Sequence, residues 1–317
     1  MIVTKSMTEL RSGIGAVCLG TFDGVHLGHQ AIMAEVVKIS RQSGKRSAAF
    51  TFHPHPSTLT GRGPVSVITT REQRARLMVA CGIDVIVEHP FTAEFAGLSP
   101  QEFVQSILLK VFGSIPYVAG FNYSFGHKAS GTIEILTELG RQYGFNVLRV
   151  EPVRVGGEVV SSTRVRKLVQ NGELSAVKAC LGRHFSLAGT VLHGDGRGRT
   201  LGFPTANVHF TAEQVLPPSG VYLLNSSEYG VGVANLGVRP TFPQQGITLE
   251  VHFLRQLEQE IYDQHIEVDI IEYLRSEQVF SDGQALRAQV FRDIERAVEL
   301  SQYLNLLNVP SNAKMGW

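Results

Sequence analysis

Two histidines three residues apart follow a short apolar run near the start of the chain. The segment TFDGVHLGHQ contains His26 and His29, and the run before it, Gly15–Gly20, is predicted to be a buried strand. The apolar spacing of Leu27–Ser40 predicts a helix that begins here, so both rings can lie on its first turn. Unpaired N–H groups and the helix dipole bind phosphates at such a position. The two imidazoles could therefore stabilise charge on an α-phosphate during nucleophilic attack.

The HxxH spacing alone is also compatible with capping or surface histidines. Its place directly after a buried strand, with Gly28 inside it, favours phosphate chemistry instead. Gly20, Gly24 and Gly28 let the backbone approach a ligand closely, because glycine carries no Cβ.

A second anion-binding helix start is predicted in SSTRVRKLVQNG. Ser161, Ser162 and Thr163 can cap a helix, and Arg164 follows on its first turn. Such a turn could hold the distal phosphates of ATP. The alternative is an ordinary serine cap with a solvated basic face.

The segment HGDGRGRTLGFPTANV combines a glycine-rich loop with the start of a strand. Gly194, Gly196, Gly198 and Gly202 lie within nine residues, and their N–H groups could surround phosphates. The spacing matches neither a P-loop nor a dinucleotide-binding fingerprint, and a long hairpin loop would also need glycines.

Polar side chains at alternate positions of two predicted strands could serve a metal-dependent reaction. Thr205 and Asn207, in PTAN, share one strand face, and their oxygens suit a Mg²⁺ that carries ATP phosphates. In TLEVHF, Glu250 lies opposite an apolar face and could accept a proton from an attacking hydroxyl. Outward-facing polar residues are the alternative for all three.

The first half of the chain alternates strands with helices, which predicts a doubly wound parallel sheet. The predicted elements after the first strand and helix are a strand at Ser47–Phe52, a helix at Thr70–Ala80, a strand at Ile83–Val87, a helix at Ser99–Lys110, a strand at Pro116–Ala119, a helix at Thr132–Tyr143 and a strand at Phe145–Val150.

The second half is rich in strands, which predicts a small antiparallel barrel. Its predicted strands are His184–His193, Thr205–His209, Gly220–Asn225, Tyr229–Leu236, Thr248–Leu254 and Ile266–Leu274. A last helix opens with a capping box made by Ser281 and Gln284. It carries an apolar stripe that we expect to lie against the barrel: Leu286, Val290, Ile294 and Val298. We place the domain boundary at Arg183, giving domains 1–183 and 184–317.

Composition narrows the class of protein. The chain has 317 residues, enough for two domains, and its net charge of +1 provides no field for nucleic acid or an acidic membrane surface. The three cysteines, Cys18, Cys81 and Cys180, are far apart, so we expect neither zinc nor disulfides. No run is long and apolar enough to span a membrane, and we expect a cytoplasmic protein.

The motifs resemble, in order, those of bacterial bifunctional riboflavin kinase/FMN adenylyltransferases. TFDGVHLGHQ, TFHPHP, AGFNYSFGHKASGT and SSTRVRKLVQNG are similar to the adenylyltransferase half, and GDGRGRTLGFPTANV, PSGVYL, ANLGVRPTF, LEVHF and YLR to the riboflavin kinase half. The resemblance implies a Rossmann-like nucleotidyltransferase domain, a six-stranded barrel, ATP and Mg²⁺ as cofactors, and riboflavin and FMN as substrates. Small molecules, rather than nucleic acid or membranes, are the expected partners.

The resemblance also implies roles for particular residues. His26, His29 and Glu250 are the expected catalytic residues, with Glu250 as base for the riboflavin 5′-hydroxyl, and Thr205 and Asn207 belong to the Mg²⁺–ATP site. The expected ATP and phosphate contacts are Gly20, Asp23, Gly28, Asn122, Ser161, Ser162, Thr163, Arg164, Gly194, Gly196, Arg199 and Gly202. Phe52 and Arg275 are expected to contact flavin.

Two departures from the family pattern bear on these expectations. Many members carry Asp where this chain has Asn122, and an amide can only form hydrogen bonds where a carboxylate would also bring charge. Where members carry an acidic residue and then a Tyr-Gly turn, this chain reads LRQLEQEIYDQ, with Tyr262 followed by Asp263.

Three other interpretations remain. One is a riboflavin kinase with an inactive adenylyltransferase half. Another is a regulatory protein that binds flavin without turnover, although His29, Asn207 and Glu250 are all retained. The third is a nucleotidyltransferase acting on pantetheine or nicotinate phosphates, which would leave the PTAN half unexplained.

Overall fold

The computed structural model of the chain describes residues 2–4, 13–58, 66–193, 202–210, 214–238, 247–257 and 259–306. The chain divides into two compact units. We call them the sheet unit, Met1–Arg166 with Cys180–Gly182, and the barrel unit, Lys167–Ala179 with Arg183–Trp317. The predicted boundary at Arg183 stays a prediction, because two helices before it, α6 (Ser162–Gln170) and α7 (Leu174–Leu181), contribute to both units.

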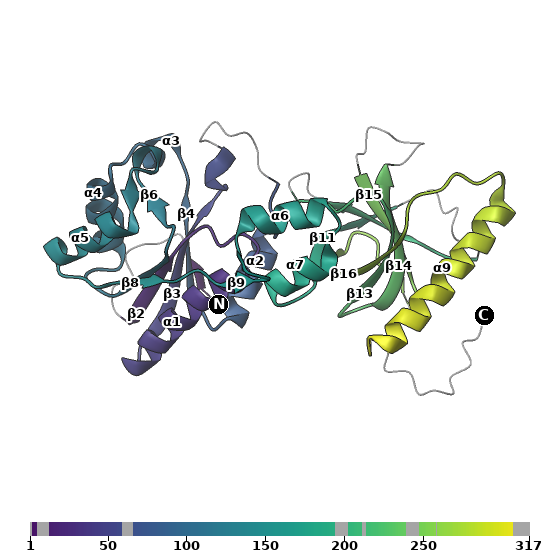
Figure 1. The fold of residues 1–317 in the computed structure, drawn as a ribbon, viewed down its shortest axis with the longest axis horizontal. Helices are drawn as coiled ribbons and strands as arrows, with labels where there is room; N and C mark the ends of the chain where they lie inside the picture. The colour runs from purple at the N-terminus through teal and green to yellow at the C-terminus, as the bar shows by residue number, and fades with distance from the viewer. Residues whose placement is uncertain are drawn as a thin grey trace. The chain divides into compact units, whose positions relative to one another are not determined.

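The sheet unit contains a six-stranded parallel sheet with helices on both faces (Figure 1). The strands run in the order β1-β4-β3-β2-β5-β8. Their bounds are Ile2–Thr4 for β1, Ile14–Leu19 for β2, Arg46–His53 for β3, Val85–Pro90 for β4, Tyr117–Gly120 for β5 and Val147–Val150 for β8. The prediction of a doubly wound parallel sheet is confirmed.

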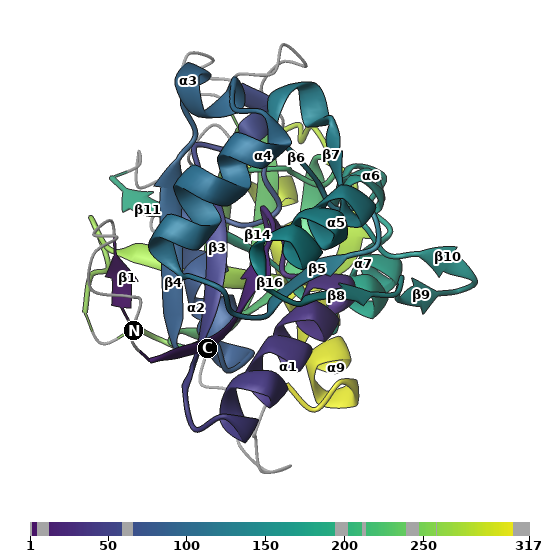
Figure 2. The same cartoon turned by 90° about the vertical axis from the view of Figure 1, so that its left-hand side faces the viewer.

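The central strand β2 buries both of its faces, as expected for a parallel sheet covered on two sides. Val17 and Leu19 belong to one apolar layer, and Ala16 and Cys18 to the other. The layer around Ala16 is completed by α1 (Leu27–Gln42) and α2 (Arg71–Ala80). The layer around Val17 is completed by α4 (Pro100–Phe103), the π-helical segment that continues it (Val104–Leu109) and α5 (Ile133–Tyr143), helices visible in Figure 2.

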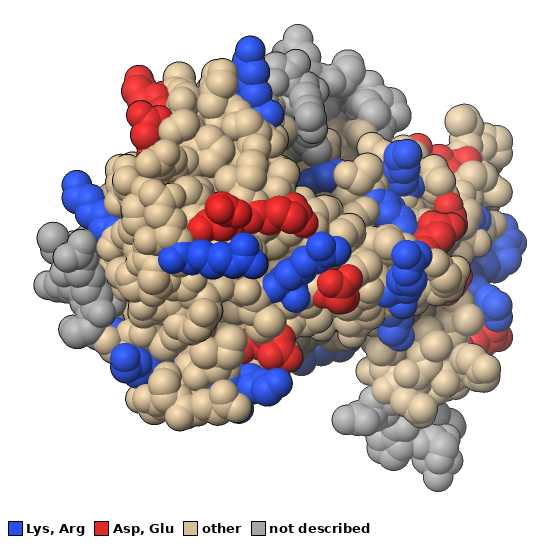
Figure 3. All heavy atoms as spheres, turned by 60° about the vertical axis from the view of Figure 1, so that its left-hand side comes forward, with Lys and Arg blue, Asp and Glu red and all other residues tan. Residues whose placement is uncertain are grey.

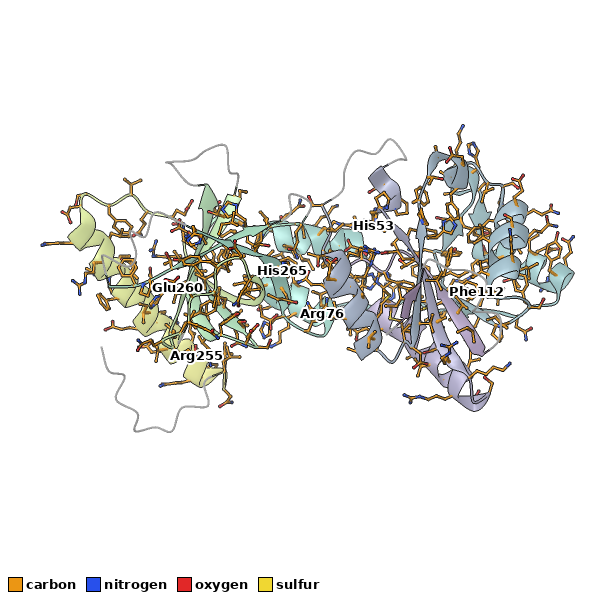
Figure 4. The ribbon with its side chains drawn as sticks, turned by 180° about the vertical axis from the view of Figure 1, so that it is seen from behind. His53, Arg76, Phe112, Arg255, Glu260 and His265 are labelled. Atoms are coloured by element: carbon orange, nitrogen blue, oxygen red, sulfur yellow. The ribbon has the colours of Figure 1, made fainter. Side chains whose placement is uncertain are left out.

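The predicted helix Ser99–Lys110 is therefore present, but its hydrogen bonding changes along its length. Ser99 and Glu102 form a capping box with Pro100 at the first helical position, which favours a regular start. The π-helical segment that follows turns Val104 and Leu108 into the apolar layer. Phe112, labelled in Figure 4, packs in the same layer.

The barrel unit contains a closed antiparallel barrel, as predicted, with strand order β11-β12-β15-β14-β13-β16. The bounds are Phe185–Leu192 for β11, Ala206–Phe210 for β12, Gly220–Ser226 for β13, Gly230–Val238 for β14, Ile247–Phe253 for β15 and His265–Arg275 for β16. His265, where β16 begins, is labelled in Figure 4, as is Glu260 in the segment before it.

Helix α9 (Gly283–Tyr303) packs on one outer face of the barrel. Ile294 and Ala297 contact an apolar cluster made of Val221, Leu223, Val231, Val233 and Ile271. Three of the four residues of the predicted stripe pack here, since Val290 and Val298 flank the cluster that contains Ile294. Leu286, the fourth, is half-buried and does not belong to this cluster. Alternate residues of β13, such as Tyr222 and Leu224, are fully buried and face the barrel interior.

The predicted capping box of this last helix is wrong. Asp282 is the N-cap, and its side chain accepts hydrogen bonds from the N–H groups of Gln284 and Ala285 at 2.9 and 2.8 Å. A carboxylate satisfies two orphan donors and is favoured by the helix dipole, so Asp282 replaces the neighbouring Ser281 in this role.

Two further predictions concern the cysteines and membrane spans. Cys18, Cys81 and Cys180 are all free thiols, with Cys18 and Cys180 buried. Within the described residues, no helix is both long and apolar enough to cross a membrane.

The barrel and α9 form their own core, so we predict that a fragment spanning residues 184–317 folds by itself. A longer fragment, 167–317, should be more stable, because it keeps the residues around Gly172, which lies beside Pro218. Circular dichroism during urea unfolding should give one cooperative transition for each fragment. If 184–317 is unfolded while 167–317 is folded, the boundary lies inside or before the segment 167–183, which includes the end of α6 and helix α7.

Candidate active sites

The carboxyl ends of several parallel strands surround a cavity of about 840 Å³ in the sheet unit. Its lining includes Leu19 at the end of β2, Phe52 near the end of β3, Gly120 at the end of β5 and Val150 at the end of β8. Ligands of doubly wound folds bind at this edge of the sheet. The structure thus places a pocket where the fold favours one.

The start of α1 brings the two predicted histidines together. His26 is the N-cap, and its Nδ1 accepts a hydrogen bond from the N–H of His29 at 3.4 Å. The two rings stack with centroids 3.7 Å apart and planes 17° apart, and both line the cavity. A Cβ on Gly28 would lie 3.2 Å from the His26 ring, so glycine at this position leaves room for the stack.

His29 is held in its neutral form. Burial, then the neighbouring His26 and then the Arg74 guanidinium lower the pKa of His29 well below its ordinary value. Its Nδ1 is buried and has no hydrogen-bond partner among the described residues. A neutral imidazole at pH 7 can donate one hydrogen bond without placing a permanent charge in the cavity.

The start of α6 faces the same cavity. The Ser161 hydroxyl accepts a hydrogen bond from the N–H of Arg164 at 3.2 Å, which caps the helix as predicted. Ser161, Ser162 and Thr163 all line the cavity. The cavity is therefore bordered by two helix N-termini, and each offers unpaired N–H groups to an anion.

Arg164 is not among the residues that line the cavity. Its Nη1 donates to the carbonyls of Val155 and Glu158 at 3.0 and 3.1 Å, and its Nε pairs with the Glu158 carboxylate at 3.1 Å. Arg164 thus supports the hairpin formed by β9 (Arg154–Val155) and β10 (Glu158–Val159).

Of the other residues predicted for this site, Gly20 and Asn122 line the cavity and Asp23 does not. A Cβ on Gly20 would lie 3.0 Å from the Phe22 ring, so this position requires a small residue. The Asp23 carboxylate is only 2% exposed and pairs with Arg166 at 2.6 Å.

The cavity also has an aromatic wall that motif analysis found only at Phe52. The Phe52 ring lies 5.5 Å from Phe91 and 5.3 Å from Phe95, measured between centroids. Tyr123 stacks on Phe125 at 5.6 Å with planes 18° apart. These rings come from segments far apart in the sequence, so no local pattern links them. A flat aromatic ligand fits such a wall.

In the barrel unit, strand pairing brings the predicted kinase residues together. Asn207 on β12 is paired in register with Glu250 on β15, which is paired on its other side with Asn235 on β14. Paired residues project on one face, so the three polar side chains form a row across three strands. Asn207 is 5% exposed, and Glu250 is half-buried.

Thr205 directly precedes β12, and its position is fixed from the neighbouring strand. The Nδ1 of His252, on β15, lies 2.9 Å from the Pro204 carbonyl and donates to it. The Phe203 ring contacts His252 edge to face at 6.5 Å. His252 therefore holds the PTAN segment beside Glu250.

Asn235 and Glu277 were not predicted as site residues. Asn235 Nδ2 donates to Glu277 Oε1 at 3.0 Å, and this carboxylate lies so close to Gly237 that a Cβ there would be 2.1 Å from it. Glu277 is in a segment after β16 and meets Asn235 only through the barrel fold, so spacing gives no signal for the pair.

The remaining residues predicted to bind ATP or flavin in this unit lie in three different settings. Gly194, Gly196 and Arg199 lie outside the described residues, whereas Gly202 is exposed with φ of 91°. Arg275 makes a bidentate ion pair with Asp293 of α9, with hydrogen bonds of 2.7 to 3.1 Å. This contact ties β16 to α9.

The stretch around Tyr262, which departs from the family pattern, packs against His193 at the start of the glycine-rich segment. Tyr262 stacks on His193 with centroids 3.8 Å apart. Asp263 has φ of 61°, and its N–H donates to the Val191 carbonyl at 2.8 Å. The departure therefore replaces a Tyr-Gly turn by a stacked turn at the end of β11.

The described residues on the face drawn in Figure 3 carry charges of both signs. On the face drawn in Figure 3, Lys and Arg side chains alternate with Asp and Glu. Arg149, for example, pairs with Glu134 and with Glu151 at 3.4 and 3.2 Å. This face therefore has no extended patch of one charge among its described residues.

Fold and sites together define a two-domain transferase in which a nucleotidyltransferase sheet is joined to a kinase barrel. The sequence model of the FAD synthetase family matches residues 11–164, and that of riboflavin kinase matches residues 181–301. A bifunctional riboflavin kinase/FMN adenylyltransferase from Listeria monocytogenes is 36% identical over 300 residues, which cover 92% of this chain and 93% of the relative. The relative of the same name from Escherichia coli K12 is 35% identical over 281 residues, covering 87% and 89%.

This chain belongs to the bifunctional riboflavin kinase/FMN adenylyltransferase family. A crystal structure from Streptococcus pneumoniae, titled a macrolide-efflux protein, is also similar, with a TM-score of 0.81 and 28% identity over 94% of this chain and 98% of that one. That title describes the other protein, and what it shares with this chain is the fold.

The lowered pKa of His29 predicts a pH-dependent stability of the sheet unit. The unfolded chain takes up a proton at this residue below about pH 6.5, whereas the folded chain does not, so stability falls as the pH falls. Between pH 7.5 and 5.5 this residue should account for a loss on the order of 1 kcal/mol in the free energy of unfolding.

Urea unfolding of the full chain at the two pH values, followed by circular dichroism, measures this loss. His29→Gln should lose less stability than the parent protein over the same interval, by on the order of 1 kcal/mol, because glutamine does not titrate. Burial also lowers the pKa values of His55 and His89. Both residues are present in the parent and in the variant, so their contributions cancel in the comparison. An identical pH dependence in parent and variant would contradict a neutral, buried His29.

Proposed function

We propose that this chain makes FAD from riboflavin in two ATP-dependent steps. The barrel unit transfers the γ-phosphoryl group of ATP to the riboflavin 5′-hydroxyl, giving FMN and ADP. The sheet unit joins FMN to the AMP part of a second ATP, giving FAD and pyrophosphate. The observation that carries the proposal is that family membership extends over both units, each with its own polar site.

In adenylyl transfer, a phosphate oxygen of FMN attacks the α-phosphorus of ATP, and the bond to the pyrophosphate oxygen breaks. The N–H groups at the starts of α1 and α6 would hold the phosphates, since both line the same cavity. His26 and His29 would donate hydrogen bonds to the α-phosphate as negative charge builds on it. Gly20 and Gly28 would allow the close approach.

The flavin ring system would lie against the aromatic wall of the cavity. Phe52, Phe91 and Phe95 supply apolar ring surface there, which suits a large flat heterocycle. Asn122, which lines the same cavity, could donate its amide N–H to a carbonyl or phosphate oxygen.

In the kinase reaction, Glu250 would accept the proton of the riboflavin 5′-hydroxyl as that oxygen attacks the γ-phosphorus of ATP. The half-buried carboxylate lies in the row with Asn207 and Asn235, at a position exposed enough to meet a substrate.

Thr205 and Asn207 fit a Mg²⁺ ion that arrives with ATP. Their neutral oxygens are hard donors, and Asn207 is largely buried beside the Glu250 strand. Among the described residues, no group of three or more His, Cys, Asp or Glu side chains could hold a metal ion, so the nucleotide phosphates would supply the charge. When bound, the ion would neutralise the developing charge on those phosphates.

The assignment extends to the remaining ligands and to the location. Arg275 and Gly202 are proposed to border the flavin and ATP sites of the barrel unit. The substrates are small molecules made and used in the cytoplasm, which is the proposed location and agrees with three free cysteines.

An inactive adenylyltransferase half is the alternative, and the site geometry favours an active one. The stacked pair of His26 and His29 and the capped turn at Ser161 border one cavity, as adenylyl transfer requires. Asn122 is the one departure, and it preserves a polar side chain at the cavity.

The first functional prediction concerns the order of products. With riboflavin, excess ATP and Mg²⁺, chromatography should show FMN first and FAD later, with pyrophosphate appearing together with FAD. Supplying FMN directly should give FAD without a lag. FMN that accumulates without FAD at saturating ATP would instead establish the kinase-only alternative.

The second functional prediction tests the proposed base. Glu250→Gln retains size and hydrogen bonding but cannot accept a proton, so riboflavin phosphorylation should fall by about 10²–10⁴ in kcat while riboflavin still binds. FAD formation from FMN should be unchanged, because that reaction belongs to the sheet unit. Glu228→Gln, in an exposed turn of the same barrel, is the matched control and should behave as the parent.

A loss of only a few-fold for Glu250→Gln would remove Glu250 from the base role. Phosphoryl transfer through a loose transition state depends mainly on positioning and charge stabilisation, so the kinase itself would then proceed without this base.

A further inference from the structure

A buried carboxylate in the loop between β2 and α1 joins three segments of the sheet unit. Asp23 is 1% exposed. Its Oδ1 accepts hydrogen bonds from the N–H groups of Ile68 and Thr69 at 2.9 and 3.1 Å, and lies 3.3 Å from the Thr69 hydroxyl, which donates to it. Its Oδ2 pairs with Arg166 Nη2 at 2.6 Å. Both carboxylate oxygens thus accept hydrogen bonds from groups of the protein itself.

Arg166 reaches this carboxylate from the second turn of α6. Its side chain is 15% exposed, and its Nε donates to the Ser66 carbonyl at 2.8 Å. The start of the same helix is attached to the loop a second time, because the Ser162 hydroxyl donates to the Asp23 carbonyl at 2.9 Å. Two bonds, one to the side chain and one to the backbone of Asp23, therefore connect α6 to the loop.

These bonds determine how the two helix N-termini stand relative to each other. Helix α1 begins at Leu27, four residues after Asp23, and α6 begins at Ser162, four residues before Arg166. The helix starts are close, since a Cβ on Gly28 would lie 3.8 Å from the Val160 carbonyl oxygen. A small movement of α6 would change the width of the phosphate site between them.

Neither side chain of the ion pair lines the cavity. We propose that Asp23 and Arg166 are positioning residues for adenylyl transfer, whose ion pair sets the spacing of the two helix N-termini so that both hold the triphosphate of ATP. The inference rests on the function proposed for the sheet unit. It differs from a direct phosphate contact, because the pair acts through α1 and α6.

The test is a double-mutant cycle with Asp23→Asn, Arg166→Gln and the combined variant. Each single change removes the ion pair, and asparagine keeps an oxygen for the N–H groups of Ile68 and Thr69. Each should raise the KM for ATP in FAD formation by about 10- to 100-fold, the scale of a misplaced binding group, with a smaller change in the KM for FMN. The combined variant should be no worse than the single ones, since one interaction is lost in all three.

Two further variants separate positioning from general damage. Arg166→Lys keeps a charge that can reach the carboxylate and should recover part of the ATP affinity. Asp84→Asn removes a carboxylate that accepts bonds from Ser47 before β4, away from the cavity, and should leave the KM for ATP unchanged. Riboflavin phosphorylation by the same protein samples reports the amount of folded barrel unit, and urea unfolding by circular dichroism reports the sheet unit.

Several outcomes would overturn the inference. An Arg166→Gln loss far larger than that of Asp23→Asn, with additive effects in the combined variant, would mean that Arg166 contacts ATP itself. Unchanged KM for ATP in both variants, or a loss explained entirely by unfolding of the sheet unit, would leave the pair without a positioning role. Failure of the parent protein to make FAD from FMN would refute the proposed function instead.

Discussion

A buried ion pair holds together the ends of three adjacent strands where the cavity opens. Arg74 and Glu88 are 8% and 7% exposed and lie 2.9 Å apart. The same guanidinium donates to the carbonyls of Thr21, after β2, and Phe52, on β3, at 3.2 and 3.1 Å. Glu88 also pairs with Arg71. Removing Glu88 would leave the buried Arg74 guanidinium uncompensated, which typically costs about 3–5 kcal/mol. The loop that carries the histidines starts from this anchored point, so the phosphate site depends on it.

That anchoring allows the loop to keep an unfavourable backbone. Phe22 and Val25 have φ of 53° and 38°, a region that bulky and β-branched residues rarely adopt. Such residues cost about 1–3 kcal/mol each and persist only where the surroundings hold them. Both side chains are buried, and the Phe22 ring meets His29 edge to face at 5.3 Å. The strain is located beside His29, the residue proposed to act in adenylyl transfer, and strained backbone is often found at active sites.

Residue spacing was sufficient to predict those features of the sheet unit that depend on short stretches of sequence. The strand before His26, the helix after it and the cap at Ser161 all follow from patterns within about a dozen residues. Spacing did not predict which arginine of SSTRVR is buried. Arg164 was predicted to bind phosphate, yet it supports a hairpin, and Arg166 turns inward because its partner Asp23 lies 143 residues earlier in the chain. Spacing identifies a basic helix face, whereas long-range packing decides which guanidinium is buried.

The proposed ATP sites of the two units use different means, and their topology explains the difference. In the parallel sheet, helices begin near the carboxyl edge, so N–H groups at helix starts can face phosphates. In the described part of the antiparallel barrel, the polar groups of the proposed site are strand side chains, with Asn207 proposed to hold Mg²⁺–ATP and Glu250 to act as base.

The cavity of the sheet unit holds His29, whose pKa burial lowers. Asn122 lines the same cavity, in which FMN and ATP, with several negative charges, are proposed to bind. A carboxylate there would add repulsion unless a cation balanced it, whereas an amide can donate to a phosphate or flavin oxygen without charge. An amide at position 122 is therefore compatible with the proposed adenylyl transfer.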